Sequence, residues 1–217
     1  MPERIVDSDT DLVIEGFPRC ANSFLEAAFH VMQRGVRYRV VHHTHAPAPV
    51  LKAVQLRVPT AVVFRNPVDA VSSLLLHHPG VFTIRSAFAE FVSFYTALQP
   101  YWGEVVLSPF EVTTSEPQRV IAELNARYGA AFRDNWLGKA DEEAAFRLVD
   151  LLTEERVGSV DDHYSPFFDE TYRRQRRERR QRIGARVALH RSAERLRAER
   201  LFEQLLGNSS LLRGDRS

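Results

Sequence analysis

The sequence has little cysteine and little lysine, and it contains no long apolar run. Cys20 is the only cysteine, which excludes an intrachain disulfide and a cysteine-rich zinc site. No segment reaches the roughly 18 consecutive apolar residues that a membrane-spanning helix needs. The N-terminal segment MPERIVDSDTD is polar and lacks the apolar stretch of a secretory signal peptide. These absences predict a cytoplasmic chain that does not span a membrane.

Positive and negative charges nearly balance along the chain. Its 217 residues include 29 Lys and Arg and 28 Asp and Glu, and the net charge of +1 does not predict binding to nucleic acid or to a membrane surface. Lysine occurs only as Lys52 and Lys139, a bias that we attribute to a GC-rich, bacterial genome rather than to function. The length and the 44% content of hydrophobic residues predict a single globular domain over residues 1–217.

Apolar runs alternate with helical patterns from about residue 10 to residue 130. Strands are predicted at 12–14, 36–41, 60–64 and 104–107, and helices at 23–33, 50–57, 68–77, 88–101 and 117–128. A strand that alternates with a helix in this way returns to the same sheet in the same direction. The alternation therefore predicts a three-layer α/β/α fold with a central parallel sheet.

The pattern is helical from about residue 140 to residue 206, so we expect extra C-terminal helices beyond the α/β core. Residues 157–169 are predicted to form a loop, and 171–206 to form one long helix or two. Residues 207–217 are predicted to be a frayed tail. The terminal helix can pack on the domain or on a second copy, which leaves a homodimer as an open alternative.

Polar turns follow three of the predicted strands, at 16–23, 42–47 and 65–67. Parallel α/β sheets bind their ligands outside the carboxyl ends of the strands, so we expect these turns to converge on one pocket. The first turn leads directly into a helix, where backbone N–H groups and the helix dipole favour a bound anion. Arg19 adds a fixed cation at the same place.

The turn at 16–23 only partly fits the phosphate-binding motif G-x-x-x-x-G-K-[ST]. Gly16 and Ser23 match the ends of the motif, but Ala21 replaces its second glycine and Asn22 replaces its lysine. Because that lysine contacts the terminal phosphates, its loss disfavours hydrolysis of ATP or GTP. The alternative interpretation is an ordinary strand-to-helix turn that carries a surface arginine.

Three further features suggest chemistry, and each has a plainer alternative. Cys20 at a helix N-terminus can be a reactive thiol, but Glu26 stands where a phosphatase loop needs arginine, so a small residue that fills the turn is favoured. His42, His43 and His45 can hold a metal with a distant ligand, supply a general base, or be polar residues at a strand end. The segment 173–182 holds seven arginines and can bind nucleic acid or form a solvated helix face.

Three segments, in this order, resemble the PAPS-dependent sulfotransferases, whose sulfonate donor is 3′-phosphoadenosine 5′-phosphosulfate (PAPS). The family's 5′-phosphosulfate loop, Y-P-K-S-G-T-T-W, is similar to FPRCANSF at 17–24. Its K-T-H-x-P segment, which carries the catalytic histidine, is similar to HTHAP at 43–47. Residues 65–73 match its 3′-phosphate motif, R-N-P-x-D-x-x-x-S, at every specified position. The resemblance covers about residues 10–130.

This resemblance implies a P-loop NTPase-like fold and in-line transfer of a sulfonate from PAPS to a hydroxyl or amine, with 3′,5′-ADP as product and no metal. It implies that His45 is the catalytic base and that Arg19 and His43 act beside it. Donor binding is implied for Pro18, Arg19, Cys20, Ala21, Asn22, Ser23, Phe24, Arg65 and Ser73. The acceptor, a small molecule, lipid or glycan, is left open, as is whether an aromatic stripe over residues 88–102 lines its pocket or packs in the core.

The chain departs from the family pattern in four places. Arg19 and His43 replace lysines, which alters the geometry of one cationic contact and makes the other depend on pH. Ala21 replaces a glycine, so we expect a less tight turn. The family's late R-K-G-x-x-G segment has no clean match, and an arginine from 173–182 can serve the 3′-phosphate instead. A P-loop kinase and a non-catalytic protein that binds a nucleotide or nucleic acid are the alternative functions.

Overall fold

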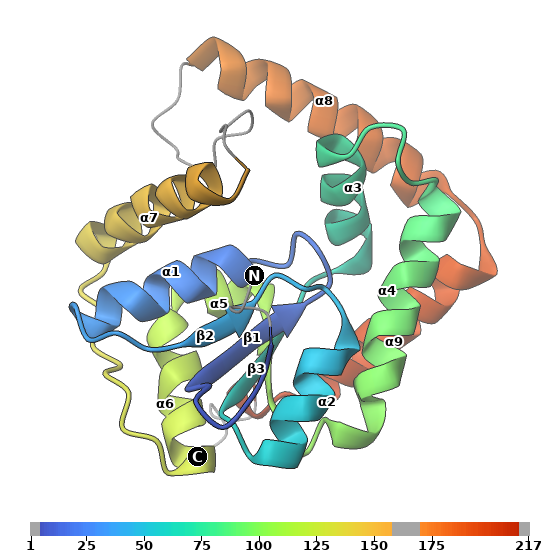
Figure 1. Cartoon of the computed structure of the whole chain (residues 1–217). Coiled ribbons are helices and arrows are strands. Elements are labelled where there is room, and N and C mark those ends of the chain that lie inside the picture. Colours follow the sequence, from blue (N-terminus) through green and yellow to red (C-terminus); the bar gives the residue numbers. More distant parts are fainter. Residues whose placement is uncertain (1–4, 158–169, 213–217) are drawn as a thin grey trace.

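The fold is built on a four-stranded parallel sheet, as the alternation of strands and helices predicts. A computed structural model describes residues 5–157 and 170–212 of the chain (Figure 1). The strands lie in the order β2-β1-β3-β4, and every neighbouring pair is parallel. Their bounds are β1 Leu12–Gly16, β2 Val40–His42, β3 Thr60–Phe64 and β4 Val106–Pro109.

Two strands begin later than their apolar runs suggest. β2 was predicted to begin at residue 36, but the backbone N–H of Arg39 donates to the carboxylate of Asp11 instead of a neighbouring strand. The Arg39 guanidinium also pairs with Asp7 at 2.6 Å. β4 was predicted over 104–107, but the N–H of Glu104 closes a turn on the carbonyl of Tyr101. Side-chain and turn hydrogen bonds therefore override strand propensity at both places.

Helices cover both faces of the sheet and give three layers (Figure 1). On one face, α1 (Asn22–Gln33) packs with α5 (Phe110–Ser115), α6 (Pro117–Tyr128) and α7 (Lys139–Val157). The other face carries α2 (Pro47–Leu56), α4 (Ile84–Leu98) and α9 (Ala193–Asn208). Beside them, α3 (Pro67–His77) packs against α8 (Glu170–Leu189). Two short 3₁₀ helices, Gln99–Tyr101 and Ser210–Leu212, complete the described elements.

The C-terminal part forms two helices, not one, and packs on the rest of this chain. α8 ends at Leu189, and α9 restarts after Ser192, whose hydroxyl caps it by accepting from the N–H of Arg195. The prediction of a frayed tail is wrong for its first residues, because Ser209 is fully buried and donates to the carbonyl of Leu107. The predicted loop at 157–169 lies outside the described residues, apart from Val157. None of the helices in the described ranges has the length and apolarity needed to cross a bilayer.

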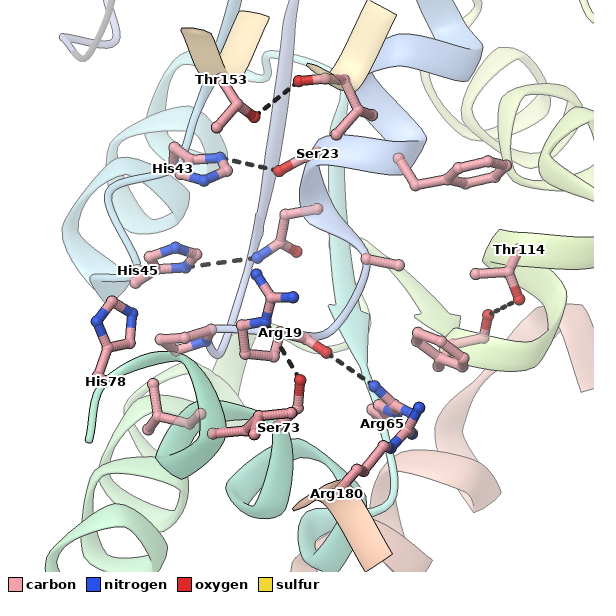
Figure 2. A pocket seen from close by; sticks show the side chains of 18 of the residues that line it. Arg19, Ser23, His43, His45, Arg65, Ser73, His78, Thr114, Thr153 and Arg180 are labelled. Carbon is pink, nitrogen blue, oxygen red and sulfur yellow. Dashed lines mark hydrogen bonds between the residues drawn. The ribbon is translucent and has the colours of Figure 1, made fainter. Parts of the chain in front are cut away.

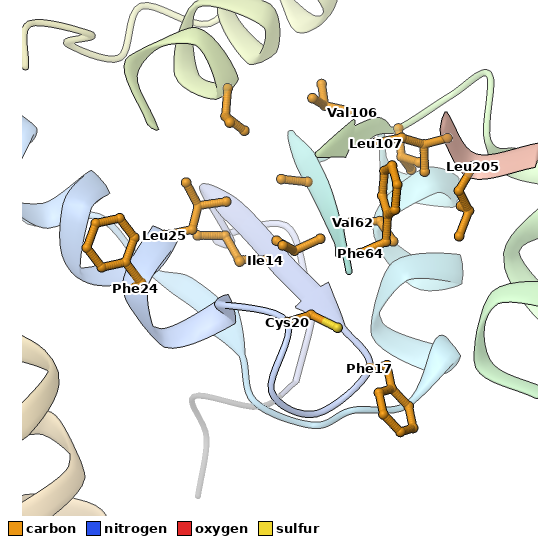
Figure 3. Close-up of a cluster of buried hydrophobic side chains, with 14 of the residues drawn as sticks. Ile14, Phe17, Cys20, Phe24, Leu25, Val62, Phe64, Val106, Leu107 and Leu205 are labelled. Atoms are coloured by element: carbon orange, nitrogen blue, oxygen red, sulfur yellow. The ribbon is translucent and has the colours of Figure 1, made fainter. Parts of the chain in front are cut away.

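The core lies on both sides of the sheet and includes the aromatic stripe of α4. Every residue of the four strands is buried, as expected for a parallel sheet covered on both faces. Figure 3 shows Ile14 of β1, Val62 of β3 and Leu107 of β4 within this cluster, with Cys20 also turned toward it. All the aromatic residues at 88–102 except the half-buried Tyr101 are buried as well: Phe88, Phe91, Phe94, Tyr95 and Trp102. The stripe is therefore mainly core.

The strand order creates a crevice between the carboxyl ends of β1 and β3. The chain leaves β1 toward β2 on one side, whereas it leaves β3 toward β4 on the other. The two following turns consequently separate at this point, which is where open α/β sheets bind ligands. The turn after β1 carries Arg19, and the turn after β3 carries Arg65.

Gly16 ends β1 in close contact with the backbone of β3. A Cβ atom at this position would lie 2.3 Å from the Val63 carbonyl oxygen and 2.8 Å from Oδ1 of Asn22. Because the first of these atoms belongs to the backbone of a buried strand, a side chain here requires the sheet itself to move.

We therefore expect Gly16→Ala to lower the free energy of unfolding by about 1–3 kcal/mol, the usual cost of overpacking a core. Gly103→Ala is the matched control, because a Cβ there meets no atom within 4 Å and the expected change is within about 0.5 kcal/mol. Urea unfolding of the two variants measures both values. Equal losses in the two variants would contradict the close approach at Gly16.

Candidate functional site

A cavity of about 1010 Å³ lies at the carboxyl end of the sheet (Figure 2). The turns after β1 and β3 form its floor, and α3, α7 and α8 contribute its walls. It is lined by every site residue that the sequence predicts except Cys20: Pro18, Arg19, Ala21, Asn22, Ser23, Phe24, His43, His45, Arg65 and Ser73. The three polar turns thus converge on one pocket, as their positions after parallel strands predict.

Four residues around this cavity hold left-handed backbone conformations that favour glycine. Arg19 and Ala21 in the first turn have φ values of 69° and 77°, and His43 and His45 have 63° and 52°. Such conformations cost a non-glycine residue about 1–2 kcal/mol, and they persist where the surroundings hold them in place. Ala21 thus keeps the backbone shape that a glycine would adopt there, so its side chain does not by itself loosen the turn.

The Arg19 side chain lies across the cavity floor toward α3. Its Nε donates to Oγ of Ser73 at 3.3 Å, and its Nη2 lies 2.7 Å from Nε2 of His77. Its backbone carbonyl accepts a hydrogen bond of 3.3 Å from Nη1 of Arg65. These contacts join the two turns that flank the crevice, and they place Arg19 between the two predicted anion-binding segments.

Cys20 contributes no side chain to the cavity. Its thiol is fully buried, and burial raises its pKa to about 12, so it is not a thiolate nucleophile at neutral pH. The hydroxyl of Tyr95 lies 3.7 Å from the sulfur and donates to the Val63 carbonyl at 2.8 Å. The same hydroxyl accepts from the N–H of Phe17 at 3.2 Å, so Tyr95 anchors the first turn to β3. The interpretation of Cys20 as a small residue that fills the turn agrees with this packing.

Arginines gather at one end of the cavity. Arg65 stacks on the ring of Phe110, with its guanidinium carbon 3.9 Å from the ring centroid. Its pKa is lowered, first by burial and then by the nearby cation of Arg180 on α8. Arg177, one turn earlier on α8, also lines the cavity. Among the lining residues in the described part of the chain, none is Asp or Glu, so the cavity carries positive but no negative side chains.

One hydrogen bond of the His45 ring defines which of its nitrogens carries the proton. Its Nδ1 lies 2.9 Å from the carbonyl oxygen of Gly16, and a second contact, to Nδ2 of Asn22, is longer at 3.4 Å. Because a carbonyl oxygen only accepts, the shorter contact requires the proton on Nδ1. Nε2 is then the nitrogen that can take up a proton, as a general base must.

A carboxylate that the motif comparison overlooked holds the histidine turn in place. Glu15 is fully buried within β1 and accepts from both the N–H and the hydroxyl of Thr44, at 2.8 and 2.7 Å. Its second oxygen accepts from the N–H of His45 at 3.0 Å. The signal for this role was visible in the sequence, because Glu15 is the one charged residue inside the apolar run LVIEG.

The other two histidines have separate surroundings. His42 is buried and pairs through Nε2 with the buried carboxylate of Glu26 at 2.7 Å. Nδ1 of His43 lies 3.2 Å from Nδ1 of His42 and 3.5 Å from Oγ of Ser23, and the His43 ring is 5.0 Å from that of His45. In the parts of the chain that the structure describes, no group of three or more His, Cys, Asp or Glu side chains is arranged to hold a metal ion.

The buried Glu15 should make stability depend on pH in a defined direction. Desolvation raises its pKa above the ordinary 4.5, although the hydrogen bonds from Thr44 and His45 oppose that shift. The folded state therefore binds this proton more readily than the unfolded state does. The stability that protonated Glu15 contributes is fully present below the ordinary pKa of 4.5, and it declines as the pH rises through the raised pKa of the folded state.

We expect the unfolding free energy of the wild type, measured relative to Glu15→Gln, to fall as the pH rises above about 4.5. Urea unfolding of both proteins in steps from pH 4 to pH 8 measures this difference, and the glutamine variant serves as the non-titrating control. A difference that stays constant or grows with pH would contradict the assignment.

Comparison with known proteins gives no family assignment. A scan against models of protein families found no match, and a search of curated proteins also found none. The function of the chain therefore has to be inferred from the residues that line the cavity.

Proposed function

We propose that this protein is a PAPS-dependent sulfotransferase, which moves a sulfonate group to a hydroxyl or amine of a small-molecule, lipid or glycan acceptor. The observation that carries the proposal is the pairing of two features in one cavity. Arg19, Arg65 and Arg180 meet where no described carboxylate lines the wall, and His45 presents a nitrogen that can accept a proton. In Figure 2, His43 and His45 lie on one side of Arg19, and Arg65 and Arg180 lie on the other.

The lining residues fit the charge and size of such a donor. Small-molecule and cofactor pockets span roughly 300–1,000 Å³, so a cavity of about 1010 Å³ accommodates a nucleotide. PAPS carries a 5′-phosphosulfate and a 3′-phosphate, and guanidinium groups bind such anions through paired hydrogen bonds. In the proposal, Arg65, Ser73 and Arg180 hold the 3′-phosphate, and Arg19 with the N–H groups of residues 20–24 faces the phosphosulfate.

The chemistry assigned to the chain is in-line displacement at sulfur, with positioning and charge stabilisation as the main contributions. His45 Nε2 takes the proton of the acceptor hydroxyl while the acceptor oxygen forms its bond to sulfur. The sulfur–oxygen bond to the 5′-phosphate breaks, and its electron pair stays on 3′,5′-ADP. Arg19 and the turn N–H groups stabilise the charge that develops on that oxygen. His43, beside Ser23, contacts the transferring group when it is protonated.

The alternative functions differ from this one in the ligand that they require. A P-loop kinase would bind ATP with magnesium, and a nucleic-acid-binding protein would use the arginines of α8 in a salt-dependent way. All four of Arg177, Arg179, Arg180 and Arg182 are exposed on α8, but only Arg177 and Arg180 line the cavity. This division of the arginine run supports a small anionic ligand.

A cytoplasmic location is part of the proposal, and a single buried cysteine is compatible with a reducing compartment.

Calorimetric titration with 3′,5′-ADP tests the proposal, and ATP with magnesium is the comparison ligand. We expect binding of 3′,5′-ADP and little binding of ATP. In Arg180→Ala the affinity for 3′,5′-ADP should fall roughly tenfold or more, the usual effect of losing a hydrogen bond to a charged group. Arg179→Ala, the adjacent exposed arginine on the same helix, should bind as the wild type does. Binding of ATP with magnesium but not of 3′,5′-ADP would overturn the proposal.

His45→Ala should lower turnover by roughly 10²–10⁴-fold, the contribution of a positioned general base, and leave 3′,5′-ADP affinity nearly unchanged. Arg65→Ala should have the opposite pattern, with weaker donor binding as its main effect. Release of 3′,5′-ADP from PAPS, with the acceptor that the wild type uses fastest, measures the rate. If turnover is unchanged in His45→Ala, His45 is not the base.

A further inference from the structure

A second, smaller cavity of about 230 Å³ adjoins the main one beside His45. Four residues line both cavities: Pro18, His45, Leu74 and Phe82. The remaining walls of the small cavity come from Phe17, Pro47 and one face of α4, which contributes Glu90, Ser93 and Phe94. The imidazole proposed as the catalytic base therefore forms part of the wall of both cavities.

The charged side chains that line the two cavities are of opposite sign. Arginines line the large cavity, and no described Asp or Glu does. The small cavity shows the reverse, because Glu90 lines it and no described Arg or Lys does. Since charges of one sign focus the potential within a cleft, the large cavity favours anions and the small one favours cations.

The small cavity is otherwise mostly apolar. Phe17 and Phe94 are almost completely buried, at 2% and 4% exposed, so their rings are fixed by the core. Pro47, Leu74 and Phe82 add further apolar surface. Glu90 and Ser93 lie three residues apart on α4 and hence on the same face of that helix. An apolar space with one carboxylate suits a ring or short chain that carries a positive charge.

We propose that this small cavity binds the acceptor and selects an apolar amine. The acceptor hydroxyl lies at His45, its apolar body packs between Phe17 and Phe94, and its ammonium group meets the Glu90 carboxylate. The assignment as an acceptor site rests on the proposed sulfotransferase function. It narrows the acceptor class, because a glycan would bury hydroxyl groups against aromatic walls that offer them few partners.

A matched pair of phenols tests this selectivity without any need for turnover. Tyramine and 4-ethylphenol share the phenol ring and a two-carbon chain, but only tyramine carries an ammonium group at pH 7. We expect the protein with 3′,5′-ADP to bind tyramine roughly three- to fivefold more tightly, the size expected for a partly exposed ion pair. In Glu90→Gln this preference should disappear, while the affinity for 4-ethylphenol stays the same. Ligand-observed NMR titration at low ionic strength measures both affinities.

Glu104→Gln is the control for overall charge, because Glu104 is exposed just before β4, at the opposite end of the sheet, and it should keep the preference. Three results would overturn the inference: equal affinities in the wild type, a preference that survives in Glu90→Gln, or no binding of either phenol. Failure of 3′,5′-ADP to bind is a separate result, which counts against the sulfotransferase proposal. In that case the titrations on the protein alone still decide whether the small cavity selects an apolar cation.

Discussion

The close approach of β1 and β3 at Gly16 is the constraint on which the site depends. The end of β1 lies so near the Val63 carbonyl that no side chain fits between them, and Tyr95 ties the following turn to the same carbonyl. The turn is therefore held directly beside the crevice at the point where the strand order reverses. With that position fixed, Arg19 meets Ser73 on α3, and Arg65 reaches back to the carbonyl of Arg19.

Buried carboxylates organise the histidine side of the cavity. Glu15 points from a fully buried strand to the backbone of Thr44 and His45, and Glu26 pairs with His42 from α1. Burying such groups is unfavourable unless their hydrogen bonds are satisfied, so each carboxylate constrains the atoms that satisfy it. The left-handed backbone at His43 and His45 is held by this arrangement. The ring of His45 then takes its orientation from the Gly16 carbonyl, so one residue at the end of β1 shapes both sides of the site.

The sequence predicts the sheet, the layers and most of the cavity because those features depend on local patterns. Apolar runs mark the buried strands, and polar turns after parallel strands must share one edge. The roles of Glu15, Tyr95 and Arg180 were not predicted, because each depends on contacts between distant parts of the chain. Arg180 in particular is one of seven similar residues, and only the packing of α8 on α3, near Gly184 and Ser72, decides which of them line the cavity. The start of β2 was also missed, since Asp11 binds the N–H of Arg39 that a longer strand would need.

The proximity of Arg65 and Arg180 affects how firmly α8 packs on the rest of the protein. The cation of Arg180 helps to lower the pKa of Arg65, so the two guanidinium groups repel each other and the helix that carries Arg180 docks against an opposing force. An anion between them reverses the sign of that force. Binding of an anion and docking of α8 are then coupled, and each makes the other more favourable by the same free energy. An anion bound between Arg65 and Arg180 would thus act as a counterion that holds α8 against α3 and the turn after β3.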